Sequence, residues 1–221
     1  MSGIALLSTA YLPPAEYFFR IADAGKALIE KEENYIKQTY RNRCYILSAS
    51  GPQALTVPVY QGSLHKTPVK DIRIDYSKRW QQVHLGALAA AYGSSPFFIY
   101  YFELVEKIIL QDHKFLVDLN MELVRAVLKM IKVEAGISYT KSFSPAEKAE
   151  NDFRYTITPK KKSGYQSKSY TRVFRTEEDQ SWRLSIVDIL FNMGPDTAGH
   201  LKSVNAETLK AAILRQPLQG S

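Results

Sequence analysis

Positively charged and amide side chains crowd one short segment, "YIKQTYRNRCYIL" at residues 35–47. Lys37, Arg41 and Arg43 are cationic, and Asn42 adds an amide between the two arginines. Arginine can bind a carboxylate or phosphate through paired hydrogen bonds, and lysine adds a compact charge. The segment therefore indicates a site in which the three cations hold an anionic small molecule and Asn42 orients the substrate.

The alternation of side chains in this segment is typical of a β-strand, and it would place Lys37, Arg41 and Arg43 on one face. Three cations on one face repel each other unless an anion, or carboxylates such as Glu32 and Glu33, compensate for them. Two interpretations therefore stay open from these residues, an anion site and a solvated sheet face screened by salt.

Two further residues could move a proton. His84 lies four residues after Trp80 on the same helical face, where it could act as an acid or base or serve as a half-buried structural histidine. Asp188 lies within the apolar "SIVDILFN", three residues after Ser185. A carboxylate in such surroundings needs a partner, so Asp188 could pair with an arginine, orient a ligand or complete a capping box.

The elements that must position these residues indicate an α/β fold. "GIALLST" predicts a buried first strand, a helix follows Pro13–Pro14 and ends at Gly25, and "KALIE" predicts a second strand. Ligands of such folds tend to bind at the carboxyl ends of the strands.

The rest of the chain alternates extended and helical patterns. Extended segments are expected to about residue 76, then helices at 80–93, 96–110 and 113–133, a strand from 137, and a helix at 185–193. We therefore expect a mixed sheet with several packed helices in a single domain over residues 1–221. A basic loop at about 159–169 could close over a ligand or be a solvated charge run.

Composition narrows the classes of function. The net charge of +7 and the pI of about 9.3 favour an anionic partner, such as a phosphate-bearing sugar or acyl donor, over nucleic acid. Cys44 is the only cysteine, and the four histidines lie far apart, so neither a disulfide nor a standard zinc site is indicated. The sequence names no cofactor. It contains neither a signal peptide nor an apolar run that could span a membrane, so a cytoplasmic protein is expected.

Five blocks in order resemble the WbqC-like protein family: "LSTAYLPPAEYFFRI", "ENYIKQTYRNRCYIL", "LTVPV", "PVKDIRIDYSKRWQQVHLGALAAAYGSSPFFIYY" and "LSIVDILFNMGP". The resemblance implies a role in bacterial surface polysaccharide (O-antigen) synthesis, with transfer of a glycyl or related acyl group to an amino sugar. A non-catalytic accessory protein that binds a ligand of the same pathway is the alternative, so the residues leave open whether the chain is an enzyme.

The resemblance also favours the anion site over the solvated face. Substrate binding is then expected at Tyr11, Pro13, Lys37, Tyr40, Arg41, Asn42, Arg43, Trp80 and Asn192, and catalysis at His84 and Asp188. Many members carry a His-Gln-Pro-type sequence where this chain has Ser8–Thr9–Ala10. They also carry a Gly-rich segment before the last helix, where this chain has one glycine, so it resembles a shortened branch that binds a similar ligand with altered or lost chemistry.

Overall fold

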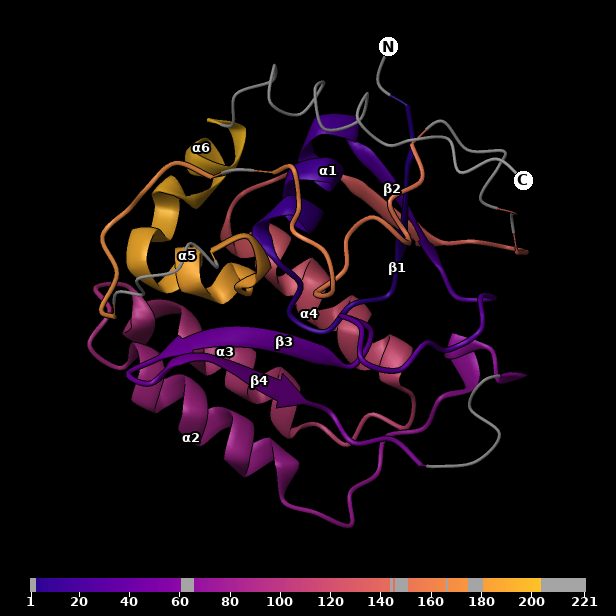
Figure 1. The fold of residues 1–221 in the computed structure, drawn as a ribbon, viewed down its shortest axis with the longest axis horizontal. Coiled ribbons are helices and arrows are strands. Elements are labelled where there is room, and N and C mark those ends of the chain that lie inside the picture. The colour runs from indigo at the N-terminus through magenta and orange to yellow at the C-terminus, as the bar shows by residue number, and fades with distance from the viewer. Residues whose placement is uncertain are drawn as a thin grey trace.

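A computed structural model describes residues 3–60, 66–143, 145, 151–165, 167–174 and 181–203 (Figure 1). Its first unit is a three-stranded parallel sheet of β1 (Ala5–Ser8), β2 (Lys26–Glu30) and β5 (Gly136–Tyr139), in the order β1-β2-β5. Helix α1 (Ala15–Ala24) joins β1 to β2, and it ends where Gly25 adopts a φ of 70° and donates its N–H to the Ile21 carbonyl. The strand–helix–strand opening predicted from the sequence is confirmed.

Strands β3 (Arg43–Ser48) and β4 (Gly51–Thr56) form a separate antiparallel hairpin. The strand predicted from residue 35 is wrong for residues 35–42, which form a loop with Gln38 at a φ of 58°. Pairing begins only at Arg43 opposite Thr56, and Pro58 beyond it has no N–H to extend the ladder. The three cations therefore do not share a strand face.

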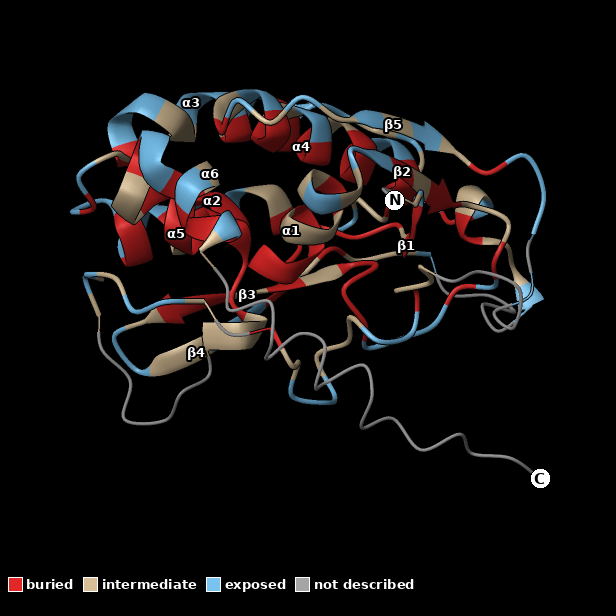
Figure 2. Cartoon of the chain, turned by 90° about the horizontal axis from the view of Figure 1, so that it is seen from above, coloured by how far each residue is buried: buried red, intermediate tan, exposed pale blue. Residues whose placement is uncertain are grey.

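Helices supply the rest of the α/β fold, which is confirmed with both parallel and antiparallel strands. They are α2 (Trp80–Tyr92), α3 (Phe98–Leu110), α4 (Leu116–Met130), α5 (Ile186–Met193) and α6 (Thr197–Lys202). Short 3₁₀ turns lie at Val69–Asp71, Ser181–Arg183 and Gly194–Asp196. In Figure 2 the hairpin lies on one side of the molecule and α3 and α4 lie on the other, with α1 and α5 between them.

Burial follows this arrangement. Figure 2 shows α5 buried and the outer surfaces of α3 and α4 exposed. Every residue of α5 from Ile186 to Phe191 is buried, and the Ser185 hydroxyl caps the helix by accepting from the Val187 N–H. This cap and the stop at Gly194 match the sequence prediction. No helix among the described residues is long and apolar enough to cross a membrane.

The conformation and surroundings of Gly194 predict that a substitution there lowers the stability of the fold. Its φ is 55°, and a Cβ built there would overlap the Phe97 ring. We expect Gly194→Ala to lower the free energy of unfolding by about 2 kcal/mol or more, since both backbone strain and overpacking oppose it. Urea denaturation measures this change.

Gly86→Ala is the matched control. Gly86 lies within α2, and no atom lies within 4 Å of the position that an alanine Cβ would take, so alanine should raise stability by about 1 kcal/mol through helix propensity. Equal effects of the two substitutions would contradict this account of Gly194.

Candidate functional site

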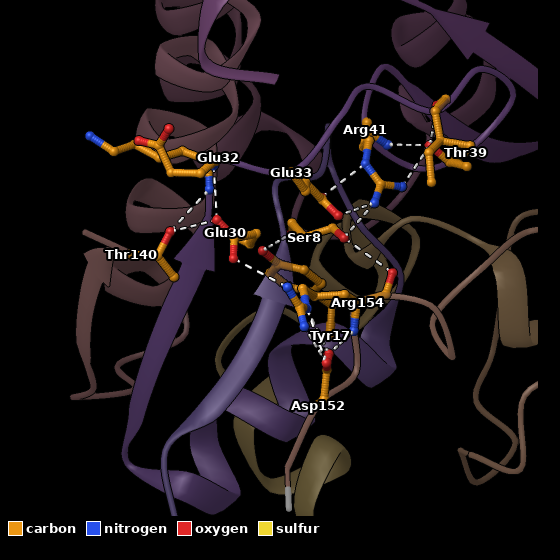
Figure 3. A network of polar contacts seen from close by, with 12 residues as sticks. Ser8, Tyr17, Glu30, Glu32, Glu33, Thr39, Arg41, Thr140, Asp152 and Arg154 are labelled. Carbon is orange, nitrogen blue, oxygen red and sulfur yellow. Dashed lines mark hydrogen bonds and ion pairs between the residues drawn. The ribbon is translucent and has the colours of Figure 1, made fainter. Parts of the chain in front are cut away.

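Polar side chains gather where the parallel strands end, as Figure 3 shows. Ser8 ends β1 and lies beside Glu30 at the end of β2, and Thr140 follows β5. This edge of an open α/β sheet is where ligands usually bind. We define the edge cluster by its residues: Ser8, Glu30, Glu33, Arg41, Thr140, Asp152 and Arg154.

Glu30 is fully buried, and both of its carboxylate oxygens are satisfied. Oε1 accepts hydrogen bonds from the Thr140 hydroxyl at 2.7 Å and from the Glu32 N–H at 2.8 Å. Oε2 pairs with Arg154 Nη1 at 3.2 Å. A buried carboxylate is costly without such partners, so Glu30 holds the loops after β2 and β5 in one arrangement.

Arg154 ties a distant segment to this edge. Its guanidinium donates to both oxygens of Asp152, with Nη2 at 2.6 Å from Oδ2. These hydrogen bonds raise the pKa of Arg154 further above its usual range. Asp152 forms a parallel bridge with Leu6, whose N–H donates to the Asn151 carbonyl at 2.9 Å. Residues 151–153 therefore extend the parallel sheet beside β1.

Arg41 belongs to the same cluster and is already paired. Nε donates to Glu33 Oε1 at 3.0 Å and Nη2 to Oε2 at 2.6 Å, with both side chains buried. Nη2 also donates to the Ser8 hydroxyl at 2.8 Å, and that hydroxyl donates to the Arg154 carbonyl at 3.1 Å. Glu33 thus compensates for the charge of Arg41, which the sequence allowed as an alternative to a bound anion.

The charge balance of the edge cluster differs from that of an anion site. Glu30, Glu33 and Asp152 carry three negative charges, and Arg41 and Arg154 carry two positive charges. The excess of one negative charge favours a ligand rich in amino and hydroxyl donors.

Two partly exposed aromatic rings flank the cluster. The Phe143 and Tyr155 rings lie 5.4 and 5.5 Å from the Arg154 guanidinium carbon. Their residues are 48% and 47% exposed, which leaves area for a ligand. Partial burial, followed by the charge of Glu33, raises the pKa of Tyr155. Flat aromatic surface beside hydrogen-bonding groups suits a sugar ring.

Asn120 of α4 connects the cluster to the helices. Its Nδ2 donates to the Thr9 hydroxyl at 3.0 Å and to the Arg41 carbonyl at 2.8 Å. Both Asn120 and Thr9 are buried. Ser8 and Thr9 therefore both take part in these polar contacts. They occupy the positions where many family members carry a His-Gln-Pro-type sequence.

His84 lies in a different cluster, with Tyr11 and Trp80. The Tyr11 hydroxyl and His84 Nδ1 share a hydrogen bond of 2.9 Å, and the Trp80 ring packs edge-on at 5.1 Å between centroids. Burial lowers the pKa of His84 to about 4, although a hydrogen bond with the Thr56 backbone opposes the shift. The ring is therefore neutral at neutral pH and is held from two sides.

Asp188 lies on α5 in a third cluster. Its Oδ2 accepts from the Tyr170 hydroxyl, and from Arg172 Nε at 2.9 Å. Asn192 donates from Nδ2 to the Asp188 carbonyl at 2.7 Å, within the same helix. In the described part of the chain, no hydrogen bond or ion pair joins Asp188 to His84, so the structure does not bring the two predicted catalytic residues into one constellation.

The other predicted site residues mostly hold the loops together. Asn42 Nδ2 donates to the Val57 carbonyl at 2.9 Å, and Arg43 Nε donates to the Thr56 hydroxyl at 3.0 Å. The Tyr11 N–H donates to the Tyr40 carbonyl, and the Ile186 N–H donates to the Pro13 carbonyl. Lys37 is exposed. Cys44 is buried, which raises the pKa of its thiol well above the ordinary range.

Sequence reasoning missed Glu30, Asn120, Thr140, Asp152 and Arg154 as site residues. Glu30 carried a usable signal, because a carboxylate that ends the apolar run "KALI" lies at the carboxyl end of a predicted strand. Arg154 carried none, because its partner Glu30 lies 124 residues away. Among the described residues, no group of three or more histidine, cysteine, aspartate or glutamate side chains could hold a metal ion.

A comparison with known families adds to this geometry. The profile of the WbqC-like protein family matches residues 9–179, which includes the Arg41 loop and Arg154. The chain therefore belongs to the WbqC-like protein family.

A curated relative is similar over nearly its whole length. "Uncharacterized protein Rv1507c" of Mycobacterium tuberculosis is 26% identical over 229 residues, which cover 91% of this chain and 98% of the relative. No solved structure matches the chain significantly.

The Arg41–Glu33 pair predicts a large loss of stability when one partner is removed. We expect Glu33→Gln to lower the free energy of unfolding by about 3–5 kcal/mol, because it leaves a buried guanidinium without its counter-charge. Urea denaturation of both proteins measures the difference. Glu103→Gln, which breaks the exposed Glu103–Lys107 pair, is the control and should change nothing measurable. Similar effects of the two substitutions would refute the role given to the buried pair.

His84 predicts a pH dependence of stability. Its folded pKa of about 4 lies below the unfolded value of 6.5, so protonation favours the unfolded chain. Above pH 6.5 the ring is neutral in both states and contributes no slope. As the pH falls from about 6.5 to about 4, stability should fall by about 3 kcal/mol through this group.

Urea unfolding of the native chain and of His84→Gln over this pH range isolates the contribution. The native chain should lose stability more steeply on acidification. Parallel pH profiles of the two proteins would show that His84 is not a buried neutral base.

Proposed function

We propose that the protein is a group-transfer enzyme of surface polysaccharide (O-antigen) synthesis that moves an acyl group, such as a glycyl or other aminoacyl group, to an amino sugar. The pathway and the acyl class come from the family resemblance. The place of the reaction comes from the edge cluster, at the carboxyl end of the parallel sheet.

One observation carries this proposal. Hydroxyl and carboxylate groups with an excess of negative charge meet two half-exposed aromatic rings at the edge where α/β proteins bind ligands. An amino sugar carries amino and hydroxyl donors, which the net negative charge of the edge cluster attracts, and it presents a flat C–H face to such rings. Ser8, which is partly exposed, and Tyr155, which is 47% exposed, are the residues whose hydroxyls we assign to the acceptor.

The reaction also needs a base. The acceptor nitrogen bonds to the donor carbonyl carbon, the bond from that carbon to its leaving group breaks, and one proton leaves the nitrogen. Glu32 suits this step, because its side chain is 19% exposed, compared with 0% for Glu30 and 2% for Glu33. The Lys70 ammonium lies 2.5 Å from Glu32 Oε2, and we assign it no part in the reaction.

The catalytic and anion-binding residues predicted from the sequence have less support in the structure than Glu32. Catalysis by His84 or Asp188 stays a prediction, and it has less support because both side chains are buried and already paired. Anion binding by Arg41 likewise stays a prediction, with its charge already matched by Glu33.

A non-catalytic accessory protein of the same pathway is the second candidate. It is favoured by the completeness of the pairing at Glu30, Arg41 and Arg154, which suits a permanent structural network. Such a protein would bind an amino sugar at the aromatic rim without turning it over.

Turnover by Glu32→Gln tests the catalytic proposal. Purified protein is incubated with nucleotide-linked amino sugars and with acyl donors, namely acyl thioesters or glycine with ATP, and mass spectrometry detects the N-acylated sugar. We expect Glu32→Gln to lower kcat by about 100-fold or more, the usual contribution of a general base.

Lys70→Met is the matched control, because it removes the same ion pair and leaves the carboxylate in place. It should retain most of the activity. An equal loss in both variants would assign the effect to the ion pair and reject Glu32 as the base. Amino-sugar binding that Tyr155→Ala weakens, with no product from any donor, would favour the accessory protein.

A further inference from the structure

A hollow of about 420 Å³ lies outside the edge cluster and contains none of the predicted site residues. We call it the tyrosine hollow. Its polar and aromatic lining comes from Tyr60, Arg73, Tyr76, Asp112, His113 and Lys114. The volume lies within the range typical of small-molecule sites, about 300–1,000 Å³.

The backbone around the tyrosine hollow is fixed by pairing between three distant segments. The Tyr60 N–H donates to the Arg73 carbonyl at 3.1 Å, and the Ile74 N–H donates to the Lys114 carbonyl at 3.2 Å. Bridges of Val59 with Ile74 and of Arg73 with Phe115 continue this pairing. The hollow is therefore largely preformed, which lowers the entropy cost of binding.

The aromatic half of the hollow presents two rings in different states. Tyr60 is 59% exposed, so its ring is accessible to a ligand. Tyr76 is held in place, because its hydroxyl donates to the His113 carbonyl at 3.0 Å and its ring packs at 6.0 Å from Trp80. A planar ring can stack on such surfaces.

The charged half favours a phosphate. Arg73 and Lys114 are exposed, and no carboxylate of the described residues lies within ion-pair distance of either. His113 is already engaged through Nε2 with Glu122 at 2.7 Å. Asp112 is the one acid in the lining, close enough to Tyr76 to contribute, after burial, to the raised pKa of that phenol. A carboxylate so placed can accept hydrogen bonds from ribose hydroxyls.

We propose that the tyrosine hollow is a binding site for a nucleoside phosphate. The base stacks on Tyr60 and Tyr76, the phosphates bind Arg73 and Lys114, and the ribose hydroxyls donate to Asp112. Three features support this site. Arg73 and Lys114 lack a carboxylate partner among the described residues, Tyr60 exposes its ring, and both features border the same hollow.

The chain connects this site directly to the edge cluster. The Val69 N–H donates to the Glu33 carbonyl at 2.8 Å, and the Lys70 N–H donates to the Lys31 carbonyl at 3.1 Å. Arg73 follows Lys70 by three residues, a span of at most about 11 Å. A nucleotide-linked donor or acceptor anchored here would reach Glu32. This role rests on the proposed function, whereas nucleotide binding itself does not.

Calorimetric titration of the full chain tests the site, with a nucleoside diphosphate, the bare nucleoside and inorganic pyrophosphate as separate probes. The diphosphate of at least one base should bind more tightly than either fragment. Arg73→Ala and Tyr60→Ala should each weaken that binding by about tenfold. Circular dichroism confirms that both variants are folded.

Arg125→Ala is the matched control. Arg125 is also an exposed arginine beside a hollow, one of about 650 Å³ at the amino ends of β2 and β5, and its removal should leave binding unchanged. Absence of binding, or equal losses in Arg73→Ala and Arg125→Ala, would overturn the site. Pyrophosphate binding as tightly as the diphosphate, with no effect of Tyr60→Ala, would also overturn it.

The outcome separates this site from the proposed reaction. Glu32→Gln should lower turnover by about 100-fold or more and leave nucleotide affinity intact. Nucleotide binding with no turnover would support the nucleotide site and reject the proposed function. Turnover of donors and acceptors with no nucleotide binding would support the proposed function and reject the nucleotide site.

Discussion

Buried guanidiniums that must be neutralised are the constraint on which the carboxyl end of the sheet depends. Arg154 and Arg41 lie inside the protein, where an unpaired charge would cost several kcal/mol, roughly the whole margin of stability. Arg41 is matched by Glu33 in the loop after β2, and Arg154 is matched by Glu30 at the end of β2 and by Asp152. The Ser8 hydroxyl contacts both arginines. Loops from four parts of the sequence therefore have one arrangement in which all charges are paired. That rigidity is what a binding site at this edge would require.

Local elements could be predicted from the sequence, because their signals lie within a few residues. The stop at Gly25, the Ser185 cap and the end of α5 at Gly194 are all encoded locally. The strand expected at 35–42 failed because alternation of side chains does not reveal whether a neighbour is available for pairing, and β4 ends at Thr56.

The candidate site was harder to predict than the fold, since its residues meet only through tertiary pairing. Arg41 was singled out for its charge, but its bidentate contact with Glu33 decides what that charge can do. Arg154 lies in a segment whose local pattern is that of an ordinary loop. His84 and Tyr11, both expected at the site, are hydrogen-bonded to each other, whereas Asp188 makes separate contacts on α5. The residue types thus predicted a polar site. Its net negative charge became clear only from the pairing of the arginines with the carboxylates.

The bridge between Leu6 and Asp152 has a consequence for how the chain is made. During synthesis β1, α1 and β2 leave the ribosome early and contain contacts close in sequence, so they can form first. Glu30, however, has no guanidinium partner until Arg154 has emerged, 124 residues later. Until residues 151–153 have emerged, the β1 side of the sheet lacks this neighbour and is open to pairing with other strands. The segment 151–153 then covers that edge, and the same contact completes the candidate site before α5 and α6 have been made.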